Sequence, residues 1–334
     1  TPFSFGRCYP ARRRLADLAA PSPALFSSCP DVFKNLTVFR LGGGFVAPLE
    51  AMEQALATQP FHPCGPNEMH SQGWVPPRGQ PHAPLVESVA GHRLMRFRIE
   101  SKRVPAAVVK RELQARCAQI EATEGRQPGR REQRELKEQI VQALLPMAFA
   151  QTVDVLVWMD VAAGRVALDT TSTKRVDAVV TALVKALDGL RVEPLQTAQA
   201  PATAMAGWLA SPADDWPAHF APGREVELKA DGDSPAVVRY SRHVLDGDEM
   251  QRHLAQGKRP TRLALDWDGR VSFVLTETWQ LRRIAFQDGV FEDNDAAETD
   301  GFDGDAAITT GELSTLLGDL IAALGGTQPQ EITP

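Results

Sequence analysis

The sequence predicts an α+β fold, with antiparallel or mixed sheets, flanking helices and one helical hairpin that projects from a sheet. Segments of alternating polar and apolar residues cluster together instead of alternating strictly with helices. The periodicity becomes helical between residues 105 and 149. With 334 residues, 43% hydrophobic and 23% charged, the chain is long enough for two or three packed units.

The first half opens with the alternating segment FKNLTVFRL at 33–41, which predicts a strand, and residues 49–56 have the spacing of a short helix. Residues 61–81 are rich in Pro and Gly and predict an ordered loop with room for one short strand. The remaining predicted elements before residue 199 are strands at 93–99, 153–158, 165–170 and 191–195 and a helix at 174–187.

Two helices with a Gly/Pro turn predict the projecting hairpin. Pro105 suits a first helical position, Gly125–Gly129 interrupts the pattern, and the second helix stops near Pro146. The apolar positions follow helical spacing, at Val109, Leu113, Cys117 and Ile120 and then at Leu136, Ile140 and Leu144. Arg130 and Arg134 lie off this apolar line, so we expect them to face outward.

The second half repeats the strand pattern and closes with a helix. Its predicted elements are strands at 224–229, 236–241, 261–267, 271–276 and 280–286 and helices at 247–256 and 310–324. Residues 288–305 contain eight acidic and no basic residues, which predicts an acidic loop.

We divide the chain into four parts. Residues 1–31 contain Arg12-Arg13-Arg14 and scattered prolines without the continuous apolar core of a signal peptide, and we interpret them as an upstream extension before a start at Val32. A central α+β domain combines 32–104 with 150–198, residues 105–149 form the hairpin arm, and 199–334 form a second α+β domain. The four cysteines form no C-x-x-C pair, which favours a reducing cytoplasm.

Charge is unevenly distributed along this acidic chain, which has a net charge of −6. Residues 93–138 hold thirteen Lys/Arg and seven Asp/Glu, a local charge of +6. Two interpretations stay open: a basic arm that holds phosphates, or a solvated helical face balanced by the acidic loop. The candidate phosphate contacts are Lys110, Arg111, Arg126, Arg130, Arg131 and Arg134 on the arm, then Arg239, Arg242, Lys258, Arg259 and Arg262.

The signatures of catalysis are missing, so we predict no catalytic residue, no metal and no cofactor. The chain has no P-loop, no G-x-S-x-G and no H-E-x-x-H, and its histidines never fall at i, i+4. A nuclease could gather carboxylates around Mg²⁺, for which Asp160 with Asp169 or Asp266 with Asp268 are candidates. Asp268-Gly269 is equally a favoured hairpin turn.

Trp74 is either a stacking platform for a base or a core anchor.

Several segments carry a resemblance to the RdgC family. They are FKNLTVFRL, PFHPCGPNEMHSQGWVPPRG, LLPMAFAQT, TRLALDWDGRVSFVLTE and ITTGELSTLLGDLIAALGG, in the family's order and spacing, so that the resemblance covers residues 32–326. F-x-P-C-G together with G-W-V-P-P is specific, and so is L-A-L-D-W.

The resemblance implies a nucleoid-associated cytoplasmic protein that binds double- and single-stranded DNA without sequence preference and restrains RecA-driven recombination. It also implies a closed, ring-shaped homodimer, in which Phe149 matches one interface position and Arg242 and His243 match the site that it meets. Ser241-Arg242-His243 departs from the lysine-rich stretch of relatives, and the arm has Arg where relatives often have Lys, and both departures leave the charge intact. Two alternatives are a metal-dependent DNA-processing enzyme and a protein-interaction module that acts directly on a recombinase.

Overall fold

The structure is a computed structural model, and it describes residues 33–42, 45, 47–232, 236–243, 245, 248–287, 289–292 and 301–328. All of them fall within one unit of the chain, 31–334. The predictions for residues 1–31, for a start at Val32 and for the acidic stretch 293–300 lie outside the described residues. None of the helices in the described part is long and apolar enough to cross a lipid bilayer.

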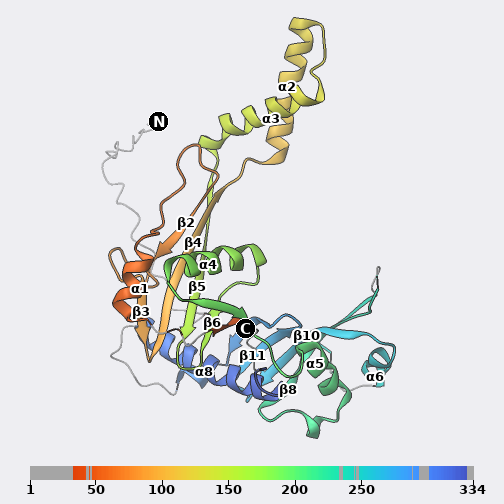
Figure 1. The fold of residues 1–334 in the computed structure, drawn as a ribbon. Helices are drawn as coiled ribbons and strands as arrows, with labels where there is room; N and C mark the ends of the chain where they lie inside the picture. The colour runs from red at the N-terminus through yellow and green to blue at the C-terminus, as the bar shows by residue number, and fades with distance from the viewer. Residues whose placement is uncertain are drawn as a thin grey trace, which may run out of the picture. The chain divides into compact units, whose positions relative to one another are not determined.

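Within these residues, twelve strands join into one sheet, and every pairing between strands is antiparallel (Figure 1). The strand order is β2-β4-β5-β6-β1-β12-β11-β10-β8-β9, with β3 beside β4 and β7 beside β1. The strands are β1 Asn35–Gly42, β2 His70–Val75, β3 Val86–Val89, β4 His92–Lys102, β5 Ala150–Asp160, β6 Arg165–Leu168, β7 Arg191–Pro194, β8 Phe220–Lys229, β9 Val237–Ser241, β10 Arg259–Trp267, β11 Val271–Thr276 and β12 Gln280–Phe286. The predicted α+β class is confirmed.

The helices cover parts of this sheet or extend from it. They are α1 Leu49–Leu56, α2 Ala106–Glu124, α3 Arg130–Leu144, α4 Thr173–Ala186, α5 Pro201–Ala210, α6 Asp248–Ala255, α7 Gly289–Glu292 and α8 Gly301–Ala323, with short 3₁₀ turns at Leu145–Met147 and Ala213–Asp215. The predicted hairpin is α2 and α3. It continues from the long β4–β5 ladder, whose last pair is Lys102 and Ala150 (Figure 1).

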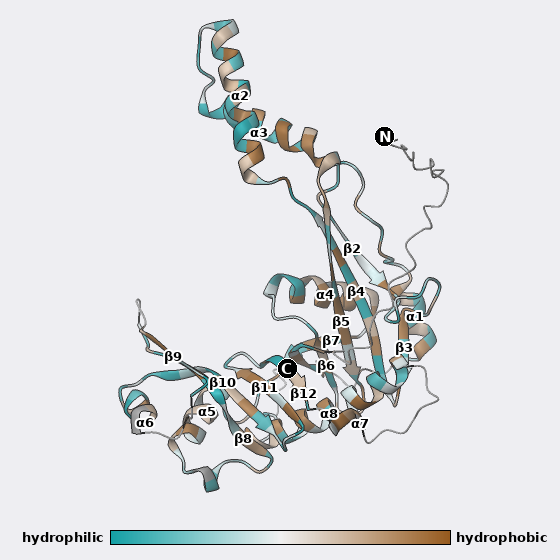
Figure 2. Cartoon of the chain, turned by 180° about the vertical axis from the view of Figure 1, so that it is seen from behind, coloured by the Kyte–Doolittle hydropathy of each residue, from teal (hydrophilic) through white to brown (hydrophobic). Residues whose placement is uncertain are grey.

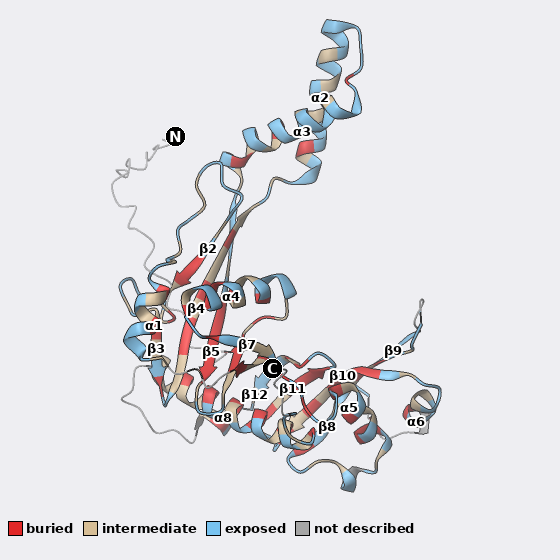
Figure 3. Ribbon diagram, viewed as in Figure 1, coloured by how far each residue is buried: buried red, intermediate tan, exposed pale blue. Residues whose placement is uncertain are grey.

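Alternation along the strands separates two hydrophobic cores on opposite faces of the sheet. Leu94 and Met95 are consecutive in β4, yet Leu94 belongs to the core that includes residues of α5 and α8, and Met95 belongs to the core that includes residues of α1 and α4. The first core extends under β8–β12, where α8 contributes Leu313 and Leu316, each fully buried. The alternation is visible as polar and apolar bands along the strands in Figure 2 and as buried strand centres in Figure 3.

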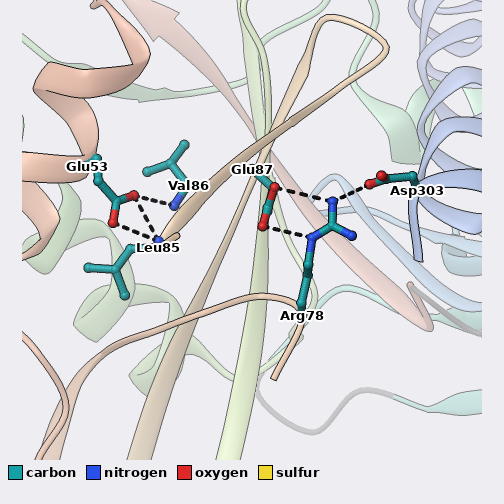
Figure 4. A network of polar contacts seen from close by, with 6 residues as sticks. All are labelled: Glu53, Arg78, Leu85, Val86, Glu87 and Asp303. Atoms are coloured by element: carbon teal, nitrogen blue, oxygen red, sulfur yellow. Dashed lines mark hydrogen bonds and ion pairs between the residues drawn. The ribbon is translucent and has the colours of Figure 1, made fainter. Parts of the chain in front are cut away.

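Arg78 attaches the short edge strand β3 to α8 (Figure 4). Its Nε lies 2.8 Å from Glu87 Oε1 in β3, and its Nη2 lies 2.5 Å from Asp303 Oδ1 in α8. On the other side of β3, Glu53 of α1 accepts hydrogen bonds from the backbone N–H groups of Leu85 and Val86. The Glu53 carboxylate thus satisfies two backbone N–H groups at the edge of the sheet, and Glu87 and Asp303 together bind the Arg78 guanidinium. These contacts hold β3 in its edge position beside β4.

The structure corrects several predicted elements. Pro105 precedes α2 as its N-cap residue instead of occupying the first helical position. α8 begins at Gly301, so Asp303 and Asp305 belong to a helix and not to the expected acidic loop. The elements β3 and α5 were not predicted, because β3 has only four residues and α5 is apolar around most of its circumference.

Candidate nucleic-acid interface

One face of the β8–β12 half of the sheet is covered, and the other is partly open. In β10, Leu263, Leu265 and Trp267 are buried in the core under α5 and α8, whereas Arg262 and Ala264, which alternate with them, are half-buried. Trp267 Nε1 also donates to Asp319 Oδ2 of α8 at 3.0 Å, which fixes the helix on that side. The alternate positions of these strands therefore present their side chains on the opposite, partly open face.

Glu227 of β8 lies at the centre of a group of charged side chains on this face. It is the register partner of Arg239 in β9 and of Arg262 in β10. Arg239 Nε donates to Glu227 Oε2 at 2.5 Å, and Arg262 Nε lies 3.8 Å from Glu227 Oε1. The hydroxyl of Thr261 donates to the same Oε1 at 2.7 Å. One carboxylate is therefore shared by two guanidinium groups.

Strand β12 brings two more arginines to this group. The Arg283 Nη2 atom lies 2.6 Å from Glu225 Oε2, although β11 and β10 separate β12 from β8 in the sheet. Arg283 has a φ of 52°, which marks a local irregularity in β12. Burial lowers the pKa of Arg282, and the nearby charges of Arg262 and Arg283 lower it further. We call Glu225, Glu227, Arg239, Arg262, Arg282 and Arg283 the open-face cluster; it has four cations and two anions.

The surroundings of Glu227 favour its ionised form. Burial by itself would raise the pKa of Glu227, but hydrogen bonds from Thr261 and Arg239 and the charges of Arg262 and Arg239 outweigh burial, so the pKa is lowered. Glu227 is thus an anion at neutral pH, and the four arginines are cations. The sequence analysis singled out Arg239 and Arg262 but missed Arg282 and Arg283; the adjacent arginines in the predicted strand QLRRIAF were the available signal.

Lys258 and Arg259 make other contacts at the start of β10. Lys258 Nζ lies 2.8 Å from His253 Nδ1 and 2.8 Å from Gln256 Oε1. Arg259 Nη2 lies 3.3 Å from Asp231 Oδ2, and both of these side chains are exposed. These two predicted contacts therefore have polar partners of their own, different from the carboxylates of the open-face cluster.

The arm carries its predicted cations on exposed positions, as expected, and mixes them with carboxylates. Arg131 pairs with Glu135 at 3.0 Å, and Arg134 pairs with Glu138 at 3.3 Å, both at i, i+4. The remaining arm pairs are Arg111 with Glu112 at 3.5 Å and Arg126 with Glu124 and with Glu132, each at 2.7 Å. Among the described residues, no ion pair is formed by Lys110 or Arg130. Exposed pairs of this kind are weak, so the arm cations can exchange their partners.

Exposed apolar side chains gather where the arm returns to the sheet. Phe149 is 92% exposed and Met147 is 70% exposed. They lie between α3 and β5, at the base of the hairpin and not at its tip. Arg242 and His243 are also exposed; they follow β9, and the His243 ring lies 5.6 Å from that of Tyr240. Large exposed apolar groups of this type are typical of contact surfaces.

The aspartates that could have formed a nuclease site have structural partners instead. Asp169 accepts hydrogen bonds from the backbone N–H groups of Lys34 and Asn35, and Asp266 Oδ1 accepts one from Gly269 N at 2.7 Å. Asp268 has a φ of 50°, as the predicted hairpin turn requires. Within the described part of the chain, no three His, Cys, Asp or Glu side chains gather as a metal site.

Trp74 is a core residue of β2. Its side chain is 1% exposed, and its ring lies 4.9 Å from that of Phe97 in an edge-on arrangement. The interpretation of Trp74 as a core anchor is therefore confirmed, and a buried indole cannot offer a stacking surface to a base.

Comparisons with known proteins place this chain among recombination-associated proteins. A family model described as "Putative exonuclease, RdgC" matches residues 32–327. The Recombination-associated protein RdgC of Cupriavidus pinatubonensis (strain JMP 134 / LMG 1197) is 42% identical over 297 residues, which are 88% of this chain and 98% of the relative. The proteins of the same name from Janthinobacterium sp. (strain Marseille) and Herminiimonas arsenicoxydans are 40% and 37% identical, over 88% and 90% of this chain and 98% and 99% of their own lengths.

Proposed function

Because this chain belongs to the RdgC family, whose members are named for their association with recombination, we propose that it binds DNA without sequence preference and restrains RecA-type recombination without catalysis. The observation that carries the proposal is the open-face cluster, in which four arginines gather on a partly open sheet face of an otherwise acidic protein. Guanidinium groups match phosphate oxygens in geometry and charge, and such contacts need no base readout. Double- and single-stranded DNA both offer them.

The proposed mechanism is an exchange of partners. In the free protein, Glu227 is shared by Arg239 and Arg262, and Glu225 holds Arg283. A phosphate backbone laid across this face competes for the guanidinium groups, and each phosphate contact releases condensed counterions from the DNA. The gain in counterion entropy favours binding. The bound protein occupies the DNA and thereby excludes a growing recombinase filament at the bacterial nucleoid.

We include a ring-shaped homodimer in the proposal. Phe149 and Met147 supply an exposed apolar contact at the base of the arm, and a cavity of about 400 Å³ lined by Pro105, Leu144 and these two residues lies there. Arg242 and His243 would receive that contact on the second copy, as the family resemblance implies. Closure around DNA would slow dissociation, because the duplex would have to leave through an opened interface.

The alternative of a DNA-processing enzyme has one observation in its favour, the description of the matching family model. It is tested by incubating labelled duplex with the protein and Mg²⁺, beside Asp266→Asn. We expect intact DNA with both proteins, because the hydrogen bond from Gly269 already accounts for Asp266. Fragments that need both Mg²⁺ and Asp266 would establish a nuclease instead.

The binding assignment is tested by measuring duplex affinity as a function of salt. Substitution of Arg239, Arg262 and Arg282 together by Ala removes three cations of the open-face cluster. If each contacts one phosphate, the slope of log affinity against log salt becomes shallower by about 2.7, at roughly 0.9 per contact. Arg270→Gln is the control, because Arg270 pairs with Glu312 of α8 on the covered side of the sheet. An unchanged slope in the triple variant would remove the cluster from the interface.

A second variant set tests the arm in the same assay. Arg130, Arg131 and Arg134 are replaced together by Ala. We expect a shallower slope, by roughly 0.9 for each arm arginine that contacts a phosphate, because the weak pairs of Arg131 and Arg134 with Glu135 and Glu138 can be exchanged. A slope equal to that of the wild type would show that the arm makes no phosphate contact.

A further inference from the structure

A row of four charged side chains crosses the sheet away from the open-face cluster. Asp160 of β5 is the register partner of Arg165 in β6, Arg165 is the partner of Arg40 in β1, and Arg40 is the partner of Glu193 in β7. Two guanidinium groups therefore stand on directly paired positions between two carboxylates. Like charges on directly paired positions are unfavourable unless anions compensate them.

The two arginines are compensated unequally. Arg40 forms a close pair with Glu193, with Nη2 at 2.6 Å and Nε at 3.2 Å from Oε2. Arg165 Nη2 lies 3.9 Å from Asp160 Oδ2 and donates one long hydrogen bond, of 3.4 Å, to the carbonyl of Ser314. Its Nη1 is buried and has no hydrogen-bond partner among the described residues.

Two other groups donate hydrogen bonds to the carboxylate of Asp160. Ala163 N donates to Oδ1 at 2.9 Å, and the Ser314 hydroxyl donates to Oδ2 at 2.6 Å. The Arg165 side chain is only 11% exposed, and burial lowers its pKa, but a guanidinium remains charged at neutral pH. A buried cation with so few acceptors is costly for the folded protein.

A cavity of about 370 Å³ adjoins this row, between the sheet and α8. Its lining includes Arg40, Arg165, Gly164, Leu195, Gly318 and Ile321. Neither Asp160 nor Glu193 lines it, so the described residues of its wall include two cations and no carboxylate. The volume falls in the range of small-molecule sites, and the leucine and isoleucine side chains offer apolar surface beside the cations.

We propose that this cavity binds a phosphate group, with Arg165 and Arg40 as its contacts. An oxyanion in the cavity would place negative charge beside the two guanidinium groups and would offset their mutual repulsion. The phosphate could belong to a small phosphate ester or to the terminus of a DNA strand. The inference is independent of the open-face cluster, with which it shares no residue.

Gly318 allows the cavity to be filled without changing either arginine. A Cβ added at Gly318 meets nothing within 4 Å, so Gly318→Leu places a side chain at the cavity wall without a clash at Cβ. Gly311→Leu is the matched control: it lies two turns earlier in α8, its added Cβ also meets nothing within 4 Å, and it does not line the cavity. Both substitutions favour the helix to the same extent.

The test is a calorimetric titration of the full chain with sodium phosphate and with a nucleoside 5′-monophosphate, at constant ionic strength and without DNA. We expect one saturable site in the wild type and in Gly311→Leu, and at least a tenfold weaker affinity in Gly318→Leu. Arg165→Met should weaken binding by a similar factor, since a charge-assisted hydrogen bond is lost. No saturable binding in the wild type, or equal affinity in Gly318→Leu, would overturn the proposal even if Arg165→Met fails to fold.

A competition experiment then identifies the source of the phosphate. Short single strands with a 5′-phosphate or a 5′-hydroxyl are added to the protein loaded with the monophosphate. Displacement by the phosphorylated strand alone assigns the cavity to DNA ends, and the absence of displacement assigns it to small phosphate esters. Equal displacement by both strands would place the monophosphate on the general DNA surface and would contradict the cavity assignment.

Discussion

Glu227→Gln should make this protein a tighter DNA binder. The substitution keeps the size of the side chain and an oxygen that can accept from the Thr261 hydroxyl, but it removes the charge shared by Arg239 and Arg262. The open-face cluster then changes from two anions and four cations to one anion and four cations. Because the Arg239 side chain is 68% exposed, the lost pairs should cost the fold no more than about 1 kcal/mol.

The expected gain follows from counterion release. If the substitution frees one guanidinium for one further phosphate, the slope of log affinity against log salt steepens by about 0.9, which corresponds to roughly eightfold tighter binding at 0.1 M salt. If the substitution frees two guanidinium groups, the slope steepens by about 1.8, which is the upper limit of the expected change. If Glu227 has only a structural role, the substitution should lower the DNA affinity instead, because loss of its hydrogen bonds would destabilise the folded protein.

The assay is fluorescence anisotropy of one labelled duplex between 50 and 300 mM salt. Glu312→Gln is the matched control: it removes one carboxylate that pairs with Arg270 at 2.5 Å, and α8 lies on the other side of the sheet. We expect no change in slope for this variant. The reasoning is refuted if Glu227→Gln binds no more tightly than the wild type, or if the two variants gain affinity equally, which would indicate a general effect of net charge.

Three further predictions address assembly, acid stability and the core. Phe149→Ser should weaken self-association in sedimentation while changing the free energy of unfolding by less than about 0.5 kcal/mol, because the ring is 92% exposed; unaltered self-association would exclude this residue from the interface. The pKa of Glu100 is lowered, mainly by the hydrogen bond from the Cys64 backbone N–H and against the effect of burial. Ionised Glu100 therefore stabilises the fold above the unfolded pKa of about 4.3, and this stabilisation is lost as the pH falls through the lower folded pKa. Urea midpoints between pH 6 and 3 should therefore decline less steeply in Glu100→Gln, and parallel curves would contradict the pKa shift. Leu316→Ala should lower the free energy of unfolding by 2–5 kcal/mol in urea titrations, since Leu316 is fully buried under the sheet; a loss below about 1 kcal/mol would show that α8 packs loosely.

The sequence predicted the bounds of an element correctly where the neighbouring residues themselves determine where that element begins and ends. The bounds of α1, β11 and β12 agree with the predicted ones, because regular periodicity and turn residues mark both ends. The turn at Asp268-Gly269 adopts positive φ at both positions, as its residue types require. The start of α8 was missed because its first residues are glycine and aspartate, which locally favour loops.

The candidate site was less predictable, because it depends on contacts across several strands. Arg239 and Arg262 looked like separate basic groups in the sequence, and only the register of β8 between β9 and β10 brings them to Glu227. Arg283 reaches Glu225 through an irregularity in β12 that no local pattern announces. The pairing of arm arginines with arm glutamates was readable from their i, i+4 spacing, and it reduces the free positive charge that a count of arginines implies.

The central claim is that arginine side chains bind phosphate backbones without reading bases or breaking bonds. The most direct measurement is the affinity of the wild-type protein for three duplexes of unrelated sequence, over a range of salt and with and without Mg²⁺. We predict one common affinity at each salt concentration, a linear and steep fall of log affinity with log salt, and intact DNA throughout. No binding at low ionic strength, a strong preference for one sequence, or degradation of the duplex in Mg²⁺ would contradict the claim.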